Sequence, residues 1–342
     1  MDPFIRTHVK DILHLPSSTL NGLIYCSKRD GGLGIPQLET LGTSKVLKQG
    51  IQLLAITDEA TQVLFRTTNF EQRLERMAKS IQIKWPISNT KCIDTHKCSQ
   101  QAIELRGWSQ LPSIGKSVLQ FADDRYGNCW LYIPSLLKPS RYLAALKVRS
   151  GNTSDRVTLN KAIPQVTLKC WKCKSCVETL VHILGQFTYT KSSRIRRHDE
   201  IHNFVAQILA TNTSEFQLIE EASIATPSGT LKLVVVHQGK VQVVDVTVRH
   251  EDTGYLEEHH NSKVAKHTLL PQLATQMKLV PGNVLPTVIG TRGAIPKSTL
   301  SSLKELKITD QGSYSTLALL ALWISIETYH CFMDTHPTKN WG

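Results

Sequence analysis

One hairpin constrains the fold of this chain more than any other stretch. Residues 231–248 read LKLVVVH, a Gln238-Gly239-Lys240 turn and VQVVDVTV. Two runs rich in β-branched residues, joined by a short glycine-containing connection, predict paired antiparallel strands. The second run holds one carboxylate, Asp245, which is either an acid at a water-facing position or a metal ligand on the central strand of a nuclease core. Alternation does not decide between these readings, because Asp245 shares its face with Val243 and Thr247.

The charge balance of the chain indicates a polyanionic partner. Its 342 residues include 40 Lys and Arg against 28 Asp and Glu, which gives a formal charge of +12. Nucleic acid and anionic membrane both fit this charge. The N-terminal stretch MDPFIRTHVKDILHL lacks the apolar run of a secretory signal, and the apolar residues 317–326 are too few to span a bilayer. We therefore expect a protein that is neither secreted nor membrane-bound, with a buried helix at 317–326.

The cysteines predict a metal site in a reducing compartment, and hence a location in the nucleus or cytoplasm. Three of the eight lie within seven residues, which favours metal binding over disulfides. Cys170, Cys173 and His182 have a C-x2-C-x8-H spacing, in which a tight turn presents two thiolates to one zinc ion. Structural zinc takes four ligands, but the position five residues past the histidine is Phe187. Cys176 is the alternative fourth ligand; the competing interpretation is a lapsed site with buried thiols.

The order of the remaining elements predicts an α/β (α+β) fold with a mixed sheet. Residues 4–15 and 37–84 have helical patterns, separated by a glycine-rich turn at 28–36, and residues 86–115 are polar and resemble a connector. In the second half, helices and strands alternate. We expect helices at 191–210, 254–270, 296–308 and 315–330, and strands from Phe216 and at 283–290, in addition to the hairpin.

Two short motifs match catalytic patterns without the context that those patterns need. Ile114-Gly115-Lys116-Ser117 ends like a phosphate-binding loop, but Gln110 stands where the first glycine belongs. Phe121-Ala122-Asp123-Asp124 resembles the acidic pair of a two-metal polymerase. A polymerase palm also requires an upstream acid on a strand, whereas the preceding residues have helical patterns and the following Arg125-Tyr126-Gly127-Asn128 is typical of a turn. Neither motif is predicted to be catalytic.

A helix with a basic first half is the candidate nucleic-acid contact. Lys191, Arg194, Arg196 and Arg197 precede an apolar face formed by residues 201–209. Guanidinium groups beside a helix N-terminus can bind phosphate, although positive charge there opposes the helix dipole unless an anion is bound. The alternative for each arginine is a solvated charged face.

Six phrases of the sequence resemble the C-terminal part of the polyprotein of site-specific non-LTR retrotransposons, which carry a reverse transcriptase and a restriction-like endonuclease. The resemblance implies a thumb-like helical region at 1–90, a linker at 91–165, a CCHC-like zinc knuckle at 166–190 and a PD-(D/E)xK-like endonuclease domain at 191–342. The polymerase palm is missing. The phrases are KRDGGLGIP, KCWKC, VETLVHILGQ, YTKSSRIRRHDEI, GKVQVVDVTVRHEDTGYLEEHHNSKVAKH and VLPTVIGTRGAIPKSTLSSLKEL.

The resemblance also implies a site for metal-dependent nicking of DNA, and this chain departs from it. Asp245 matches the second acid of the family and Lys263 its lysine, but Lys232 stands where the first acid belongs. An ammonium there removes a metal ligand and adds repulsion, so magnesium or manganese loses its binding site. His267, where the family usually has a tyrosine, is a milder departure.

The sequence thus predicts a truncated fragment of such a polyprotein. We expect it to bind DNA or RNA and to have lost the nicking activity of the endonuclease. Two alternatives stay open. In one, Glu220 or Glu221 supplies the missing carboxylate of a working endonuclease. In the other, the chain is a nucleic-acid-binding protein recruited by its host, without catalysis.

Overall fold

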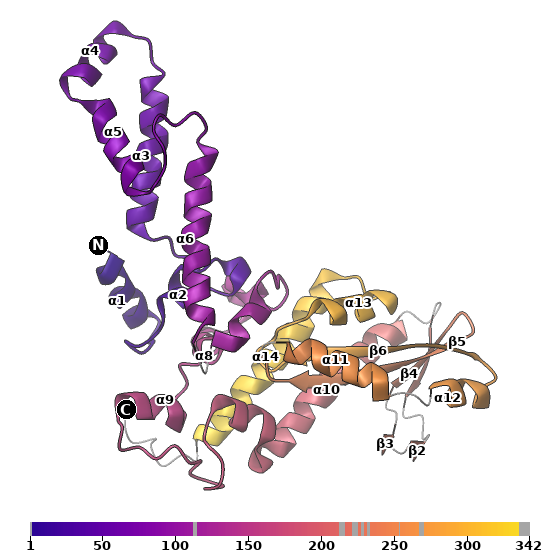
Figure 1. Ribbon diagram of the computed structural model, residues 1–342. Helices are drawn as coiled ribbons and strands as arrows, with labels where there is room; N and C mark the ends of the chain where they lie inside the picture. Colours follow the sequence, from indigo (N-terminus) through magenta and orange to yellow (C-terminus); the bar gives the residue numbers. More distant parts are fainter. Residues whose placement is uncertain are drawn as a thin grey trace. The chain divides into compact units, whose positions relative to one another are not determined.

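The computed structural model describes residues 2–111, 115–211, 216–220, 225–226, 229–230, 233–252, 254–266 and 270–334. The side chains of 220, 225–226 and 229–230 are not described. The chain divides into two compact units, one of Met1–Lys28 with Gly32–Leu111 and one of Arg29–Gly31 with Pro112–Gly342. Figure 1 labels the elements of both units.

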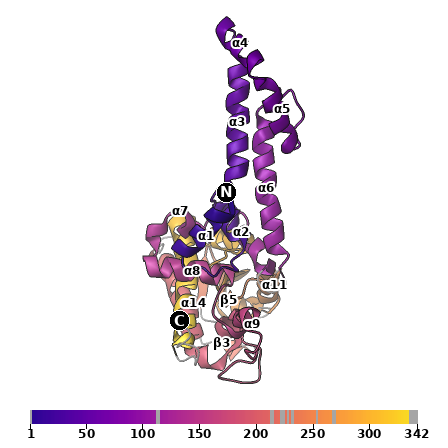
Figure 2. The same cartoon turned by 90° about the vertical axis from the view of Figure 1, so that its left-hand side faces the viewer.

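The first unit is helical. Its core is a small apolar cluster around Leu47, Leu74, Ala78 and Ile93. Gly50 lets two of its helices approach closely, because a Cβ there would lie 2.5 Å from Leu74 Cδ2. In both views of the molecule α3 and α6 lie side by side (Figures 1 and 2). The helices are α1 (Asp2–Ile12), α2 (Asn21–Tyr25), α3 (Leu38–Leu54), α4 (Glu59–Thr67), α5 (Phe70–Ser80) and α6 (Lys91–Ser109).

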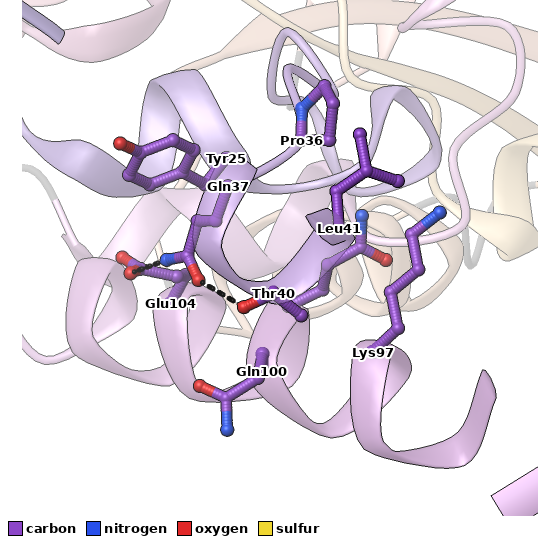
Figure 3. A pocket seen from close by; sticks show the side chains of 9 residues that line it. Tyr25, Pro36, Gln37, Thr40, Leu41, Lys97, Gln100 and Glu104 are labelled. Carbon is purple, nitrogen blue, oxygen red and sulfur yellow. Dashed lines mark hydrogen bonds between the residues drawn. The ribbon is translucent and has the colours of Figure 1, made fainter. Parts of the chain in front are cut away.

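Helix α6 occupies most of the stretch that the sequence indicated as a polar connector. Only a narrow side of α6 is buried against the rest of the unit, through Ile93 and Trp108. The remaining surface of the helix faces solvent, which is why most of its residues are polar. Figure 3 shows where α3 meets α6: Gln37 Nε2 donates to Glu104 Oε1 at 2.7 Å, and Thr40 Oγ1 donates to Gln37 Oε1 at 3.2 Å. A polar helix can therefore be held by few contacts, which periodicity alone does not reveal.

The second unit contains a four-stranded sheet in the order β1-β4-β5-β6. The predicted hairpin is formed by β4 and β5, which are joined by Gln238 and Gly239, both at positive φ as a two-residue hairpin turn requires. β1 pairs antiparallel with β4, and β6 pairs parallel with β5. The strands are β1 (Gln217–Glu220), β4 (Leu233–His237), β5 (Lys240–Arg249) and β6 (Val280–Gly290), with a separate two-stranded ladder of β2 (Ala225–Thr226) and β3 (Gly229–Thr230).

Helices cover both faces of this sheet. On one face α10 (Lys191–Thr211), α13 (Lys297–Glu305) and α14 (Gln311–Met333) pack against strand residues that include Val244 and Val246. On the other face α12 (Leu270–Gln276) packs against residues that include Val243, and the crossover from β5 to β6 also contains α11 (Tyr255–Lys266). The predicted mixed α/β class is confirmed.

Helix α14 is the predicted buried C-terminal helix. Among the described residues it alone is long and apolar enough to cross a membrane, but 56% of its most apolar window is buried inside the protein. Leu317, Ala318 and Ala321 belong to the core shared with α10 and the sheet. The composition of α14 is thus explained by its place in the core of the unit.

The segment before α10 belongs to the second unit and consists of short helices and turns. The predicted linker at 91–165 is therefore divided, since α6 lies in the first unit and residues from 115 onward lie in the second. The elements are η2 (Gly115–Phe121), α7 (Cys129–Tyr132), η3 (Pro134–Leu136), α8 (Pro139–Ser150), α9 (Arg156–Ala162), a π-helical turn η4 (His182–Gln186) and η5 (Thr188–Thr190).

Candidate functional site

Asp245 lies in the middle of β5 and is ion-paired with Lys263 of α11. Lys263 Nζ is 2.9 Å from both carboxylate oxygens, and the two side chains retain 21% and 18% of their exposure. Val244 and Val246 belong to the cluster with α10, so Asp245 is on the opposite face, beneath α11. Asp245 is therefore neither fully exposed nor without a cation.

The strand neighbour of Asp245 in β6 offers no side-chain ligand to a metal ion. This neighbour is Pro286, which is tolerated because β6 is the last strand of the described sheet. Within the described parts of the chain, no three His, Cys, Asp or Glu ligand atoms gather around Asp245. Asp245 and Lys263 thus form an ion pair beside the edge strand β6. The pair can contact a polar ligand, but it offers a single carboxylate to a divalent ion.

The position of the missing first acid and its possible substitutes lie at or beyond the limit of the described residues. Lys232 and Glu221 are outside them, as is His267, the departure from the family's tyrosine. β4 begins at Leu233, which pairs with Val244 on one side and with Glu220 on the other. Glu220 is thus two strands away from β5 and in the row of Val244, not in that of Asp245.

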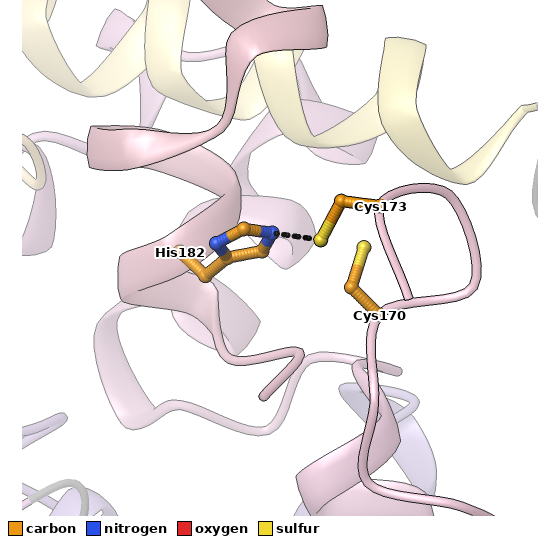
Figure 4. A group of neighbouring side chains, drawn as sticks. All are labelled: Cys170, Cys173 and His182. Carbon is orange, nitrogen blue, oxygen red and sulfur yellow. Dashed lines mark hydrogen bonds between the residues drawn. The ribbon is translucent and has the colours of Figure 1, made fainter. Parts of the chain in front are cut away.

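Three of the four predicted zinc ligands are brought together (Figure 4). The ligand atoms of Cys170, Cys173 and His182 all lie within 4.8 Å of one another, and Cys173 Sγ is 3.7 Å from His182 Nε2. Cys176 is exposed and lies outside this group. The ring of Phe187 lies 4.9 Å from that of His182. The group therefore has three donors, with an apolar ring beside them.

Local backbone contacts hold these donors in place. The amide of Cys170 donates to the carbonyl of Cys176, and the amide of Lys174 donates to the carbonyl of Cys170. The fully buried Glu178 accepts from the amides of Trp171 and Arg156 at 3.1 Å each. The loop is thus closed by hydrogen bonds without any ion.

The two thiols of the group differ in acidity. Hydrogen bonds from Ser175 and from the backbone amide of Cys176 lower the pKa of the Cys173 thiol to about 6. Burial raises the pKa of the Cys170 thiol above its ordinary value. Because the thiolate is the form that binds a metal, the lower pKa makes the metal-binding form easier to reach for Cys173 than for Cys170.

The predicted phosphate-binding arginines are engaged inside the protein. Arg197 is 2% exposed, donates to Ser325 Oγ at 2.7 Å and to the carbonyl of Leu184 at 3.1 Å, and burial lowers its pKa to about 10. Arg194 donates to the carbonyls of Gly185 and Phe187, and Arg196 is ion-paired with Glu327.

The expectation for Arg197 is therefore wrong, because its side of α10 packs against α14 instead of solvent. Arg194 and Arg196 retain partial exposure but already have acceptors. Lys191 is exposed at the first position of the helix.

The acidic pair Asp123 and Asp124 is structural, as the sequence context predicted. Asp124 Oδ1 accepts from the amide of Gly127 at 2.9 Å and Oδ2 from the amide of Ile295 at 2.8 Å, and burial raises its pKa to about 6. Asp123 is ion-paired with Arg29. Two acids that point to different partners do not form a metal site.

A buried charge network escaped sequence analysis. Glu251, fully buried, accepts from the amide of Arg292 at 2.6 Å and from its Nε at 3.1 Å. Gly290 makes room for it, since a Cβ there would lie 2.1 Å from Glu251 Oε1. The buried Arg149 donates to Asn128 Oδ1 at 2.6 Å and lies over the Phe121 ring at 3.4 Å. Partners that lie 21 and 41 residues apart in the sequence leave no local signal.

Comparison with known proteins finds curated proteins to which this chain is similar. No protein-family model matches the chain. Three curated relatives from Popillia japonica do, each described as a retrovirus-related Pol polyprotein from type-1 retrotransposable element R2. One is 26% identical over 342 residues, covering 95% of this chain and 44% of the relative. A second is 24% identical over 302 residues, covering 85% of this chain and 59% of the relative. A third is 26% identical over 215 residues, covering 60% of this chain and 42% of the relative.

The chain is a relative of non-LTR retrotransposon polyproteins. The resemblance drawn from the sequence is thereby confirmed. The chain spans about half the length of the curated relatives it matches.

Proposed function

We propose that this chain is the C-terminal part of a retrotransposon reverse transcriptase and endonuclease, that it binds nucleic acid, and that it nicks DNA negligibly or not at all. The formal charge of +12 and the retrotransposon relatives support the binding. The observation that carries the loss of nicking is the ion pair of Asp245 with Lys263. Both carboxylate oxygens already contact one ammonium, and no further set of ligands surrounds them in the described part of the chain.

The chemistry of nicking requires more than this arrangement offers. A hard divalent cation needs converging oxygens and must still keep waters, one of which attacks the phosphodiester. Asp245 alone offers one carboxylate to such an ion, and Lys263 neutralises its charge. The order helix, three antiparallel strands, helix, parallel strand (α10, β1, β4, β5, α11, β6) supports a restriction-like endonuclease ancestry of the unit.

A supercoiled-plasmid assay with magnesium or manganese tests this proposal. We expect no nicking above that of Asp245→Ala, and we expect Lys232→Asp to restore measurable nicking, because it returns a carboxylate to the position of the missing acid. Nicking by the unaltered chain that Asp245→Ala abolishes would show a working endonuclease. In that case Glu221→Gln and Glu220→Gln identify which carboxylate was recruited. The register of Glu220 with Leu233 and Val244 argues against Glu220.

Nucleic-acid binding is tested separately by its salt dependence. Neutralised phosphates release counterions, so log affinity should fall linearly with log salt concentration. An affinity that does not change between 50 mM and 200 mM salt would exclude a phosphate-dominated interface. Binding without nicking is also the behaviour of a host-recruited protein, so this assay tests the interface, not its biological use.

We also propose that Cys170, Cys173 and His182 hold zinc. Tetrahedral zinc with Zn–S of about 2.3 Å and Zn–N of about 2.0 Å places its ligand atoms about 3.5–3.8 Å apart. The 3.7 Å between Cys173 Sγ and His182 Nε2 fits this spacing. Zinc there would tie the loop at 170–176 to η4. Cys176 lies outside the group, so the proposal assigns the fourth position to a water molecule.

A further inference from the structure

A polar cavity of about 320 Å³ lies at the carboxyl end of β5. It is lined by the last residues of that strand, the start of α11, the beginning of η2 and the end of η4, all within the second unit. Arg249, Tyr255, Lys116 and Gln186 are exposed side chains of its wall, and His250 and Thr291 are more buried. No function described so far uses this cavity.

The charges of the cavity favour an anion. Glu251 is satisfied by Arg292 and Thr291 and does not offer its charge to the cavity. The remaining charged residues of the lining are then two cations, Lys116 and Arg249, and one anion, Asp252. Among the described residues, the guanidinium of Arg249 makes no hydrogen bond or ion pair, in contrast to those of Arg194, Arg196 and Arg197. Arg249 is therefore available to bind a phosphate through its fork of donors.

An aromatic ring accompanies this cation. Tyr255 is 37% exposed, and His259, one turn further along α11, meets it edge to face with ring centroids 4.3 Å apart. A tyrosine ring that is braced on one side and open on another provides a surface on which an unpaired base can stack. A base inside a duplex is already stacked and cannot use such a ring.

The cavity is aligned with the Asp245 pair. Asp245, Thr247 and Arg249 alternate onto one face of β5, and four residues of strand span about 13 Å. Lys263, His259 and Tyr255 are spaced by one helical turn along α11, and eight residues of helix span about 12 Å. Lys263 contacts Asp245, and Tyr255 and Arg249 line the same cavity, so the two rows run antiparallel and side by side.

We propose that the paired rows of β5 and α11 form the binding track for a single nucleic-acid strand. Arg249 binds a phosphate of this strand and an unpaired base stacks on Tyr255, a few nucleotides away from the nucleotide that lies over Asp245. The inference rests on the proposed nucleic-acid binding and specifies its substrate class. It assigns to the end of β5 a recognition role that is independent of metal and of nicking. A strand held there passes the Asp245 pair whether or not that pair reacts.

Fluorescence anisotropy with a labelled 20-nucleotide single strand and the matching duplex tests this inference on the full chain. We expect Arg249→Gln and Tyr255→Leu each to weaken single-strand binding by about fivefold or more, the size expected for loss of one stacked base or one phosphate contact. Lys240→Gln, at the opposite exposed end of the same strand, is the matched control and should change affinity less than twofold.

Two further measurements separate the roles of the residues. The slope of log affinity against log salt should fall in magnitude by about 0.7 in Arg249→Gln and stay unchanged in Tyr255→Leu, because one contact is ionic and the other is not. Tyr255→Trp should retain binding, which excludes a loss of folding as the cause.

The outcomes distinguish this inference from the function on which it rests. If the unaltered chain binds neither oligonucleotide, the proposed nucleic-acid binding itself fails. If it binds but Arg249→Gln and Tyr255→Leu bind as tightly, the track is elsewhere and the inference alone is overturned. Duplex binding that exceeds single-strand binding and is indifferent to Tyr255→Leu also overturns it.

Discussion

The cysteine–histidine group and the Asp245 pair have each kept part of the ligand set that the retrotransposon family implies, and the parts behave differently. Cys170, Cys173 and His182 place three donors within 4.8 Å of one another. Asp245 is ion-paired with Lys263, whose ammonium lies 2.9 Å from both of its carboxylate oxygens. Three converging donors have the geometry to bind a metal ion, whereas the Asp245 carboxylate already has a cation beside it.

The difference lies in where the ligands come from. The cysteine loop is closed by its own backbone, through contacts such as that of the Cys170 amide with the Cys176 carbonyl. A lost fourth ligand leaves the other three in position. A carboxylate site built across strands depends on each strand separately, so one changed residue removes half of the acids. Local sites therefore degrade gradually, whereas sites assembled across a sheet lose their ion in one step.

The largest expected effect is on zinc and would separate the two regions outright. The chain expressed in zinc-supplemented medium should contain about one zinc, and Cys170→Ser should contain almost none and lose several kcal/mol of stability, since binding free energy at a structural site adds to folding. Cys176→Ser is the matched control and should retain its zinc. Elemental analysis and thermal unfolding measure both quantities.

The same assay has a reverse arm. Phe187→Cys adds a thiol beside His182 and should tighten zinc binding at least tenfold, at a cost in the stability of the metal-free form because the ring also packs against Phe332. Equal zinc content in Cys170→Ser and in the unaltered chain would mean that the three donors are not ligands, and the contrast drawn between the two regions would lapse.

An intermediate effect concerns His250, which lies between the two regions in the wall of the cavity. Burial, and then the charge of Arg292, lower the pKa of His250 from 6.5 to about 4. Between these values the unfolded chain binds more protons than the folded one, so the His250 contribution to stability is lost as pH falls from 6.5 to 4. The loss is up to about 3 kcal/mol.

His250→Gln should remove that loss. Asp124 and Asp155, whose pKa values burial raises to about 6, change stability in the opposite direction over an overlapping range and flatten the curve of the unaltered chain. The informative quantity is therefore the difference in unfolding free energy between variant and unaltered chain, measured by urea titration. It should rise in favour of the variant as pH falls from 6.5 to 4; a difference that is independent of pH would contradict the buried, neutral state of His250.

The smallest expected effect concerns the Asp245 pair itself. Lys263→Met should lower the unfolding free energy by about 1–2 kcal/mol at pH 7, because it leaves a partly buried carboxylate without its charged donor. Asp245→Asn in the same chain should return most of the loss. If manganese instead raises the melting temperature of Lys263→Met by several degrees and not that of the double variant, Asp245 recruits an ion with ligands that have not been identified, and the two regions are more alike than proposed.

Local patterns predicted much of the fold. Runs of β-branched residues and a glycine-containing turn located β4 and β5, and apolar patterns located α10 and α14. The parallel pairing of β5 with β6 and the helix α12 had no comparable signal, since both depend on contacts that close only in three dimensions. α6 was missed because its buried side is narrow.

The site shows the same limit more sharply. The cysteine spacing alone predicted the three donors that meet, and the family resemblance singled out Asp245 and Lys263, whose catalytic roles stay predictions. The charge run at Arg194, Arg196 and Arg197 was interpreted as a surface, but Ser325 and Glu327 of α14 accept from two of these side chains. Whether a basic residue is a surface residue or a structural one depends on its acceptor. For Arg197 one acceptor is Ser325, 128 residues away in the sequence.

The carboxylate of Asp124 has a practical consequence for anyone who trims this chain. It joins the turn at Gly127 to the loop after β6 through Ile295, and Arg292 donates to the carbonyl of Arg149 across the same seam. A piece cut at residue 191 would keep every strand and yet strip these acceptors from its interior. The shortest soluble fragment should therefore begin ahead of residue 115, well upstream of the border that the motifs suggest.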